Sequence, residues 1–129
     1  MAEHQAPTRQ GGFVTAQFVV VVGLSLLFFT MMANVIVFMY GRGVVRAALE
    51  EGVRAASPAA ATSATCQREA DETMRSLLGG SMGREIRIEC AIRGGEVHAI
   101  ASGRFRGWLP GMPDWRFAQQ ATAVKEQLP

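Results

Sequence analysis

The stretch from Phe13 to Tyr40 reads FVTAQFVVVVGLSLLFFTMMANVIVFMY and decides the fold. Its 28 residues contain no charged side chain and no proline, and charge is absent over the longer run from Gln10 to Gly41. About 20 helical residues cross the hydrocarbon core of a membrane, so this stretch is long enough even when tilted. A soluble core helix would carry a polar stripe at helical spacing, whereas here every face is apolar. We therefore predict a transmembrane helix over residues 13–40.

A short polar leader, MAEHQAPTRQGG, occupies residues 1–12 before this stretch. A secretory signal peptide would have a shorter apolar region followed by a small-residue cleavage site. Here the apolar run is far longer, and the sequence after it, GRGVVRAALEEG, continues the helical pattern without a break. We expect the apolar stretch to stay in the mature protein and only the leader to be removable.

Residues 41–56 continue the helix but change its character from uniformly apolar to amphipathic. Apolar or small residues recur at three- and four-residue steps, at Val45, Ala48, Leu49, Gly52, Ala55 and Ala56. Arg46, Glu50 and Arg54 are spaced four residues apart, so they could form ion pairs along the opposite face. No proline interrupts the region, and one helix is expected over about residues 13–56, roughly 65 Å long.

A second, shorter helix is expected after a linker of small residues, SPAAATSAT, in which Pro58 ends the first helix. It should run from about Cys66 to Leu78, because Gly79 and Gly80 supply a natural stop. The residues expected on its apolar stripe are Cys66, Ala70, Met74, Leu77 and Leu78.

Strict alternation then indicates a β-hairpin. Apolar residues at Ile86, Ile88, Cys90 and Ile92 alternate with mostly polar ones, and the pair Gly94–Gly95 supplies a two-residue turn. The turn fixes the register, which places Arg93 opposite Glu96, Ile92 opposite Val97, Cys90 opposite Ala99 and Ile88 opposite Ala101. The same register turns Ile100 to the outer face.

The remaining sequence completes an α+β fold. Residues 103–115, GRFRGWLPGMPDW, are expected to form a loop in which Trp108, Trp115 and Pro110 cap the small core rather than bind a ligand. A third strand over about residues 117–125 would complete a three-stranded antiparallel sheet. The predicted architecture is a long N-terminal transmembrane helix that extends into a small domain, residues 41–129, with a second helix and this sheet.

The two cysteines, Cys66 and Cys90, fall on the predicted apolar faces of the second helix and the first strand. Both therefore point to one interface, where a disulfide could close a loop of about 25 residues and contribute roughly 3 kcal/mol. A membrane anchor that exports the domain favours the bond. The alternative is two free buried cysteines that act as small apolar residues.

Composition excludes several classes of function. The chain has 129 residues and a net charge of +2 with both signs interspersed, which argues against nucleic acid as a partner. Fewer than about 90 residues lie outside the leader and the span, too few for an enzyme with a roomy pocket. Because no catalytic or metal-binding motif occurs, we expect no enzyme activity, metal, cofactor or small-molecule substrate. A hydrolase activity dependent on His98 would contradict this expectation.

The order of residues around the leader resembles that of type IV prepilin-like proteins. Gly12 ends the leader, four residues follow, and Gln17 then precedes Phe18 inside the apolar run. The family normally carries Glu at the position of Gln17. We favour a peptidase site at Gly12, although from the residues alone it could instead belong to a flexible linker, and Gln17 could equally be a tolerated polar residue near the membrane interface.

A second block, ALEEGVRAA, resembles the A-x-x-x-G-x-R-A-A end of the long helix in TadE-like pseudopilins, which are minor components of tight-adherence (Flp-type) pilus machinery. Gly52 and Arg54 occupy the Gly and Arg positions of this motif. A packing role for Gly52 and a solvated or sheet-facing charge for Arg54 are the structural alternatives. The order of strand, hairpin, proline-bearing loop and last strand is also similar, so the resemblance covers nearly the whole chain.

The resemblance implies both processing and assembly. A prepilin peptidase would cut between Gly12 and Phe13, and the mature helix would lie in the plasma (inner) membrane among other pilin-like subunits. In the family, a Glu near the new N-terminus pairs with a neighbouring α-amino group. Gln17 cannot form that ion pair, but it can donate a hydrogen bond to a neighbouring helix, typically worth about 1 kcal/mol or less. The difference leaves cleavage plausible and weighs against glutamate-dependent entry into a pilus.

Orientation receives two opposing signals. Arg9 is the only Lys or Arg before the span, whereas Arg42, Arg46 and Arg54 follow it, so the positive-inside rule favours a cytoplasmic domain. The resemblance and the cysteines favour a cytoplasmic N-terminus and an extracytoplasmic domain, which we expect. The functional prediction is a TadE-like pseudopilin or minor pilin, a structural component of pilus assembly or a related secretion apparatus. The alternative is an uncleaved, single-span accessory or binding protein of a membrane complex.

Overall fold

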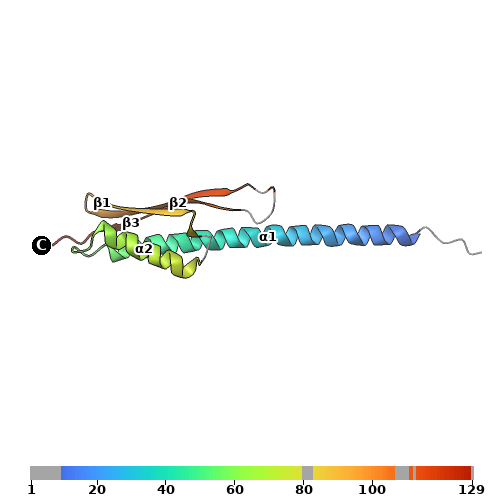
Figure 1. The fold of residues 1–129 in the computed structure, drawn as a ribbon, viewed down its shortest axis with the longest axis horizontal. Coiled ribbons are helices and arrows are strands. Elements are labelled where there is room, and N and C mark those ends of the chain that lie inside the picture. Colours follow the sequence, from blue (N-terminus) through green and yellow to red (C-terminus); the bar gives the residue numbers. More distant parts are fainter. Residues whose placement is uncertain (1–9, 80–82, 107–110, 112, 129) are drawn as a thin grey trace, which may run out of the picture. The chain divides into compact units, whose positions relative to one another are not determined.

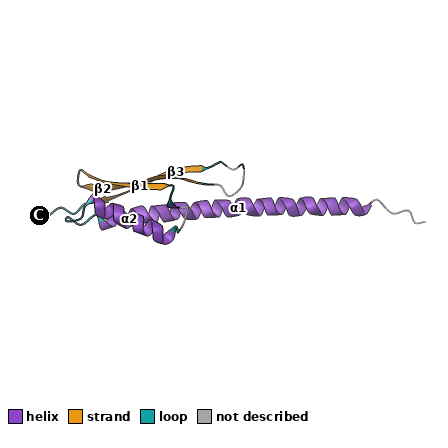
Figure 2. Ribbon diagram, in the orientation of Figure 1, coloured by secondary structure: helices purple, strands orange, loops and turns teal. Residues whose placement is uncertain are grey.

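The computed structural model describes residues 10–79, 83–106, 111 and 113–128, and it has the α+β fold that the sequence predicts. The elements in order are α1 (Gln10–Ala55), α2 (Ser63–Leu77), β1 (Ile86–Arg93), β2 (Glu96–Phe105) and β3 (Trp115–Val124) (Figures 1 and 2). The chain divides into two units, Met1–Val35 and Ile36–Pro129. α1 begins in the first unit and ends in the second.

The first unit consists of the apolar part of α1. Its large apolar side chains are all exposed, from 39% at Val22 to 75% at Phe13 and Phe29. Among the described residues, one helix is long and apolar enough to cross a membrane, as a single-pass membrane protein requires. Within that helix, Ser25 and Thr30 each donate a hydrogen bond of 2.8 Å to the carbonyl four residues earlier. Their hydroxyl donors are thus satisfied inside the helix, which suits an apolar surrounding.

In the second unit, the end of α1 carries the expected buried stripe. Val45, Ala48, Leu49, Gly52 and Ala56 are buried, and so are Val44 and Val53 beside them. Ala55 is only half-buried, because it lies toward the flank of the stripe.

α2 begins three residues earlier than the sequence predicts and ends one residue earlier. The early start follows from the Thr62 N–H, which donates to Thr65 Oγ1 at 3.3 Å and extends the helix into the small-residue linker. The predicted apolar stripe is wrong at Leu77, which is 45% exposed. Leu78 instead turns into the core after the last turn, with its N–H donating to the Met74 carbonyl at 2.8 Å.

The sheet has the strand order β1-β2-β3, and both pairs of strands are antiparallel. All four predicted pairings across the first hairpin are confirmed, from Arg93 opposite Glu96 to Ile88 opposite Ala101. The turn glycines both have positive φ, 58° and 79°, which is the reason that glycine is needed there. Ile100 is 49% exposed on the outer face, as predicted. β3 covers Trp115–Val124, so it starts two residues before the predicted strand.

The core lies between the sheet and the two helices, which cover one face of it (Figures 1 and 2). Val97, Ala99 and Ala101 of β2 are fully buried there, opposite Val45 and Leu49 among other residues of α1. The small residues of β2 allow the helices to lie close to the sheet. Among the fully buried side chains of this core, the largest by volume are Leu49, Val45, Val97 and Cys66.

Aromatic rings close the core beside α1. Phe105 is 6% exposed, stacks on Phe117 with ring centroids 4.8 Å apart, and meets the edge of Phe38 at 5.8 Å. The Phe105 ring occupies the space above Gly41, where an added Cβ would lie 2.7 Å from a ring carbon. Trp115 contacts Phe38 at 4.9 Å while remaining 49% exposed, so it covers the core, as expected. Trp108 and Pro110 lie outside the described residues.

Lys125, the single lysine of the chain, joins the end of β3 to the α1–α2 loop. Its Nζ donates to the carbonyls of Ala56, Pro58 and Ala61 at 3.0, 2.8 and 2.6 Å. The three N–H bonds of the ammonium thus match three carbonyls after the end of α1, of which the Pro58 carbonyl also accepts from the Ala61 N–H at 3.0 Å. In addition, the Glu126 N–H donates to the Ser57 carbonyl at 2.8 Å.

Candidate functional site

The predicted cleavage pair, Gly12 and Phe13, lies in the first turn of α1. The helix begins at Gln10, three residues before the predicted start, so the peptide bond between the pair is helical. Phe13 is 75% exposed, and a Cβ on Gly12 would meet no atom within 4 Å. Residues 1–9 of the predicted leader lie outside the described residues. The pair is therefore accessible, but an extended conformation there requires the first helical turn to unwind.

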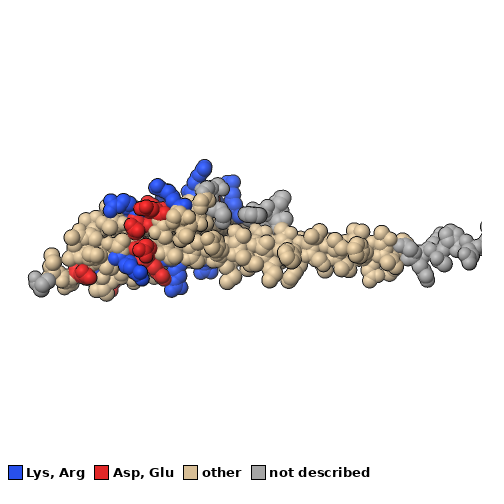
Figure 3. Space-filling view, turned by 90° about the horizontal axis from the view of Figure 1, so that it is seen from below, with Lys and Arg blue, Asp and Glu red and all other residues tan. Residues whose placement is uncertain are grey.

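The predicted assembly residues, Gln17 and Phe18, lie one turn further along. Phe18 is 67% exposed and Gln17 is also exposed, so both are available to a neighbouring helix. Figure 3 shows no charged side chain on the described apolar part of α1, in contrast to the second unit. In this setting the Gln17 amide is a neutral donor and acceptor among apolar side chains.

The cysteines form the predicted disulfide, Cys66–Cys90, with a Cα–Cα distance of 6.1 Å. The alternative of two free buried cysteines is therefore wrong. Next to the bond, Gln67 Nε2 donates to the Ile88 carbonyl at 2.7 Å, so α2 and β1 are joined by both a covalent and a polar contact. The disulfide is a structural element of the helix–sheet interface.

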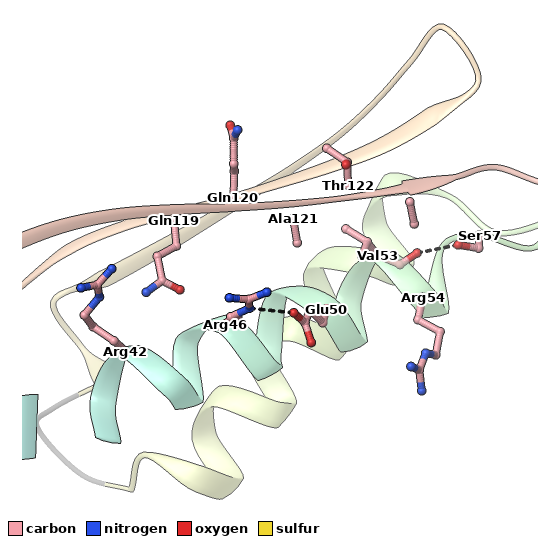
Figure 4. A pocket seen from close by; sticks show the side chains of 11 residues that line it. Arg42, Arg46, Glu50, Val53, Arg54, Ser57, Gln119, Gln120, Ala121 and Thr122 are labelled. Carbon is pink, nitrogen blue, oxygen red and sulfur yellow. Dashed lines mark hydrogen bonds and ion pairs between the residues drawn. The ribbon is translucent and has the colours of Figure 1, made fainter. Parts of the chain in front are cut away.

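The two motif residues at the end of α1, Gly52 and Arg54, have different surroundings. A Cβ on Gly52 would lie 3.0 Å from both the Ala70 Cβ and the Cys66 carbonyl oxygen, so its absence allows α2 to approach α1. This contact agrees with a packing role for Gly52. Arg54 is exposed, and its side chain points away from β3 (Figure 4).

A groove of about 690 Å³ runs between α1 and β3, and the sequence alone did not indicate it. We call it the arginine groove. Its lining is Arg42, Arg46, Glu50, Val53, Arg54 and Ser57 from the helical side and residues 119–123 from β3. In Figure 4, Gln119 and Ala121 point from the strand toward the helix, whereas Gln120 and Thr122 point to the opposite face of the sheet. The sequence signals that could have revealed the groove are the i, i+4 arginines and the position of the third strand at an edge.

The charged side chains of the arginine groove are exposed and form one weak ion pair. Arg46 Nε lies 2.9 Å from Glu50 Oε1, as the i, i+4 spacing suggests, but these side chains are 76% and 56% exposed. Such an exposed pair contributes little to stability and can exchange partners. The Arg42 guanidinium carbon lies 5.8 Å from the centre of the Phe38 ring. Glu50 offsets one of the two guanidinium groups of Arg42 and Arg46, so this part of the groove is positive.

His98 lies on the outer part of the sheet, where its Nε2 is 3.4 Å from Glu96 Oε2. Both side chains are substantially exposed, 36% and 53%. Among the residues that the structure describes, no group of three or more His, Cys, Asp or Glu side chains could hold a metal ion. The pair therefore lacks the burial that is typical of an acid–base site.

In comparisons with known proteins, no family model, curated protein or solved structure matches the chain. The resemblance to TadE-like pseudopilins therefore rests on the leader and helix motifs of the sequence. Beside those motifs, the features of the structure that bear on function are α1, the disulfide and the arginine groove.

Proposed function

We propose that the chain is a TadE-like pseudopilin or minor pilin, a membrane-anchored structural subunit of Flp-type pilus assembly or a related secretion apparatus. The observation that carries the proposal is the double environment of α1. Up to Val35 its apolar side chains are exposed on all sides, whereas from Val44 to Ala56 one stripe is buried in a small disulfide-linked domain. Exposed apolar surface of this extent needs cover from lipid or from neighbouring helices.

In the proposed mechanism, a prepilin peptidase removes the leader between Gly12 and Phe13. The mature helix stays in the plasma (inner) membrane with its N-terminus cytoplasmic, and the domain lies outside. Helix contacts with other pilin-like subunits then involve Phe18 through its exposed ring and Gln17 through a hydrogen bond rather than an ion pair. The role needs no cofactor and no small-molecule substrate.

The alternative, an uncleaved single-span accessory protein, is favoured by one specific observation. The bond between Gly12 and Phe13 lies within α1, so a peptidase that needs an extended segment must first unwind a turn. Terminal turns open at low cost, so the barrier is small. The alternative also accounts for Gln17 without any pilus, because an anchor alone needs no carboxylate.

The test is intact mass and N-terminal sequencing of the protein purified from its own membranes without reductant. Cleavage predicts a chain that starts at Phe13, and a chain that starts at Met1 or Ala2 would remove the pilin mechanism and leave the anchored accessory protein. The same spectrum should show the mass deficit of about two daltons that the bond between Cys66 and Cys90 produces.

Assembly is tested separately by placing a photo-crosslinking residue at position 18 in living cells. The proposal predicts crosslinks from there to other pilin-like subunits, because Phe18 is exposed on the helix. The matched control places the same residue at Arg68, on the exposed side of α2. Crosslinks only to lipid from position 18 would contradict assembly through the helix.

A further inference from the structure

The arginine groove lies beside the edge of β3 rather than over one face of the sheet. Its lining includes five consecutive residues of the strand, 119–123, although alternate residues point to opposite faces. A cavity reached by both sets must lie along the strand edge, where backbone N–H and C=O groups not used by β2 point outward. Five residues of strand span roughly 17 Å, enough for a short extended peptide.

β3 is a long edge without the usual protection against pairing. In the described part of the chain it pairs with β2 only, over all ten of its residues. It contains no proline and no lysine, and its one charged residue, Arg116, lies outside residues 119–123. Edge strands of this length normally carry such features, or are covered, because an open edge accepts another strand.

The spacing of the basic side chains suits an added strand. Arg42 and Arg46 are four residues apart on α1, which separates them by about 6 Å along the helix. Side chains on one face of a strand repeat about every 6.6 Å, so acidic residues at positions i and i+2 would match the two guanidinium groups. Glu50 does not prevent this match, since its exposed pairing with Arg46 can be exchanged.

We propose that the free edge of β3 binds an extended segment of a partner protein with acidic side chains at alternate positions. Main-chain hydrogen bonds to residues 119–123 would supply affinity, and Arg42 and Arg46 would select the acidic side chains. The inference goes beyond the proposed function and does not depend on cleavage at Gly12.

A second copy of this chain is a poor occupant of the groove. Among the acidic residues of the chain, only Glu69 and Asp71 are two positions apart, and both lie in α2 rather than in a strand. A copy that added its own β3 would bring a second set of arginines alongside the first, which is electrostatically unfavourable. Charge complementarity therefore favours an acidic segment from a different protein.

The test uses the full chain in neutral detergent micelles and a fluorescent eight-residue peptide that alternates aspartate with valine or threonine. Fluorescence anisotropy should show binding that weakens as salt is raised. Two matched peptides separate the components, one with asparagine for aspartate and one with alternate backbone nitrogens methylated. Both should bind at least about tenfold more weakly, because each removes one of the two recognition elements.

The protein variants locate the site. R42Q and R46Q together should weaken binding about tenfold, whereas R68Q with R75Q, on the exposed part of α2, should change it less than about twofold. Hydrogen exchange of the amides in residues 119–123 should slow with bound peptide, while that of β1 stays unchanged. An equal unfolding midpoint for both double variants confirms that each is folded.

Three outcomes would overturn the proposal. The first is equal binding of the methylated peptide, which would show attraction without strand pairing. The second is peptide binding that is equally strong in the native chain and in the variant with R42Q and R46Q. The third is binding of phosphatidylglycerol vesicles that requires Arg42 and Arg46 while the peptide shows none, which would assign the groove to an anionic membrane surface.

Discussion

At the scale of single residues, Lys125 donates more hydrogen bonds than any other side chain that the structure describes. Its ammonium group donates to the carbonyls of Ala56, Pro58 and Ala61, which belong to a segment more than sixty residues earlier in the chain. Because these acceptors follow the end of α1, Lys125 fixes the α1–α2 loop to the end of β3.

We expect K125M to lower the free energy of unfolding by about 2 kcal/mol, since three charge-assisted hydrogen bonds are lost and only the Pro58 carbonyl is shown with a second donor, the Ala61 N–H. Urea unfolding of the full chain in detergent, followed by tryptophan fluorescence, measures the change. K125R should recover only part of the loss, because a planar guanidinium cannot direct its donors at three converging oxygens. R68M is the control and should shift the value by less than about 0.5 kcal/mol. An unchanged free energy of unfolding in K125M would mean that water replaces the hydrogen bonds of the ammonium group.

Two glycines of α1 should respond to alanine in opposite directions. A Cβ added at Gly52 would lie 3.0 Å from both the Ala70 Cβ and the Cys66 carbonyl oxygen, and neither atom can rotate away. G52A should therefore destabilise the domain by about 1–3 kcal/mol through overpacking. The higher helix propensity of alanine offsets a part of this loss. A Cβ added at Gly43 would meet no atom within 4 Å, so G43A should stabilise by up to about 1 kcal/mol. The same urea series measures both variants. Equal signs would contradict the close approach of α2 to α1.

At the scale of elements, the disulfide between α2 and β1 should provide a large share of the domain's stability. Replacing Cys66 and Cys90 together with alanine removes a link across 24 residues and should cost about 3 kcal/mol. Unfolding with and without reductant measures it, and reductant should lower the midpoint of the native chain only. An unfolding midpoint of the native chain that does not change with reductant would show that the interface between α2 and β1 is stable without the disulfide.

The elements that could be predicted are those fixed by local chemistry. The hairpin register followed from Gly94 and Gly95, because a two-residue turn permits a single register. The early start of α2 was missed because the Thr62–Thr65 cap lies in a stretch that reads as a linker. The exposure of Leu77 was missed because the apolar pattern does not show on which turn a helix ends.

The features that escaped prediction depend on residues distant in sequence. Lys125 is separated from its acceptors by 64–69 residues, so no local pattern signals the contact. The arginine groove exists only once β3 lies beside α1, although its i, i+4 ion pair between Arg46 and Glu50 was predictable from spacing. Predicted cleavage at Gly12 and assembly through Gln17 remain predictions, because they concern encounters with other proteins.

At the scale of the whole molecule, the two units are suited to different surroundings. The first presents uncharged apolar surface, and the second carries charges of both signs over a core closed by a disulfide. Disulfides persist in oxidising compartments, so the bond supports an extracytoplasmic domain against the weak opposing signal of Arg42 and Arg46.

Orientation can be measured in sealed membrane vesicles. In right-side-out vesicles, added protease should degrade the domain and leave a fragment that contains the apolar part of α1, because lipid shields only the spanning helix. In inside-out vesicles the domain should stay intact until detergent is added. The reverse pattern would place the domain in the cytoplasm and would also remove the oxidising environment that the disulfide requires.

The carbonyls around Lys125 have a consequence for chemical labelling. The chain has one side-chain amine, and attack on an acylating reagent needs the nitrogen lone pair, which is not presented while three carbonyls hold the N–H bonds. Acylation at this position should therefore proceed no faster than the α1–α2 loop releases the nitrogen. The mass increment on the peptide that carries Lys125, followed in time and thereby separated from acylation of the α-amino group, would report the rate of that local opening.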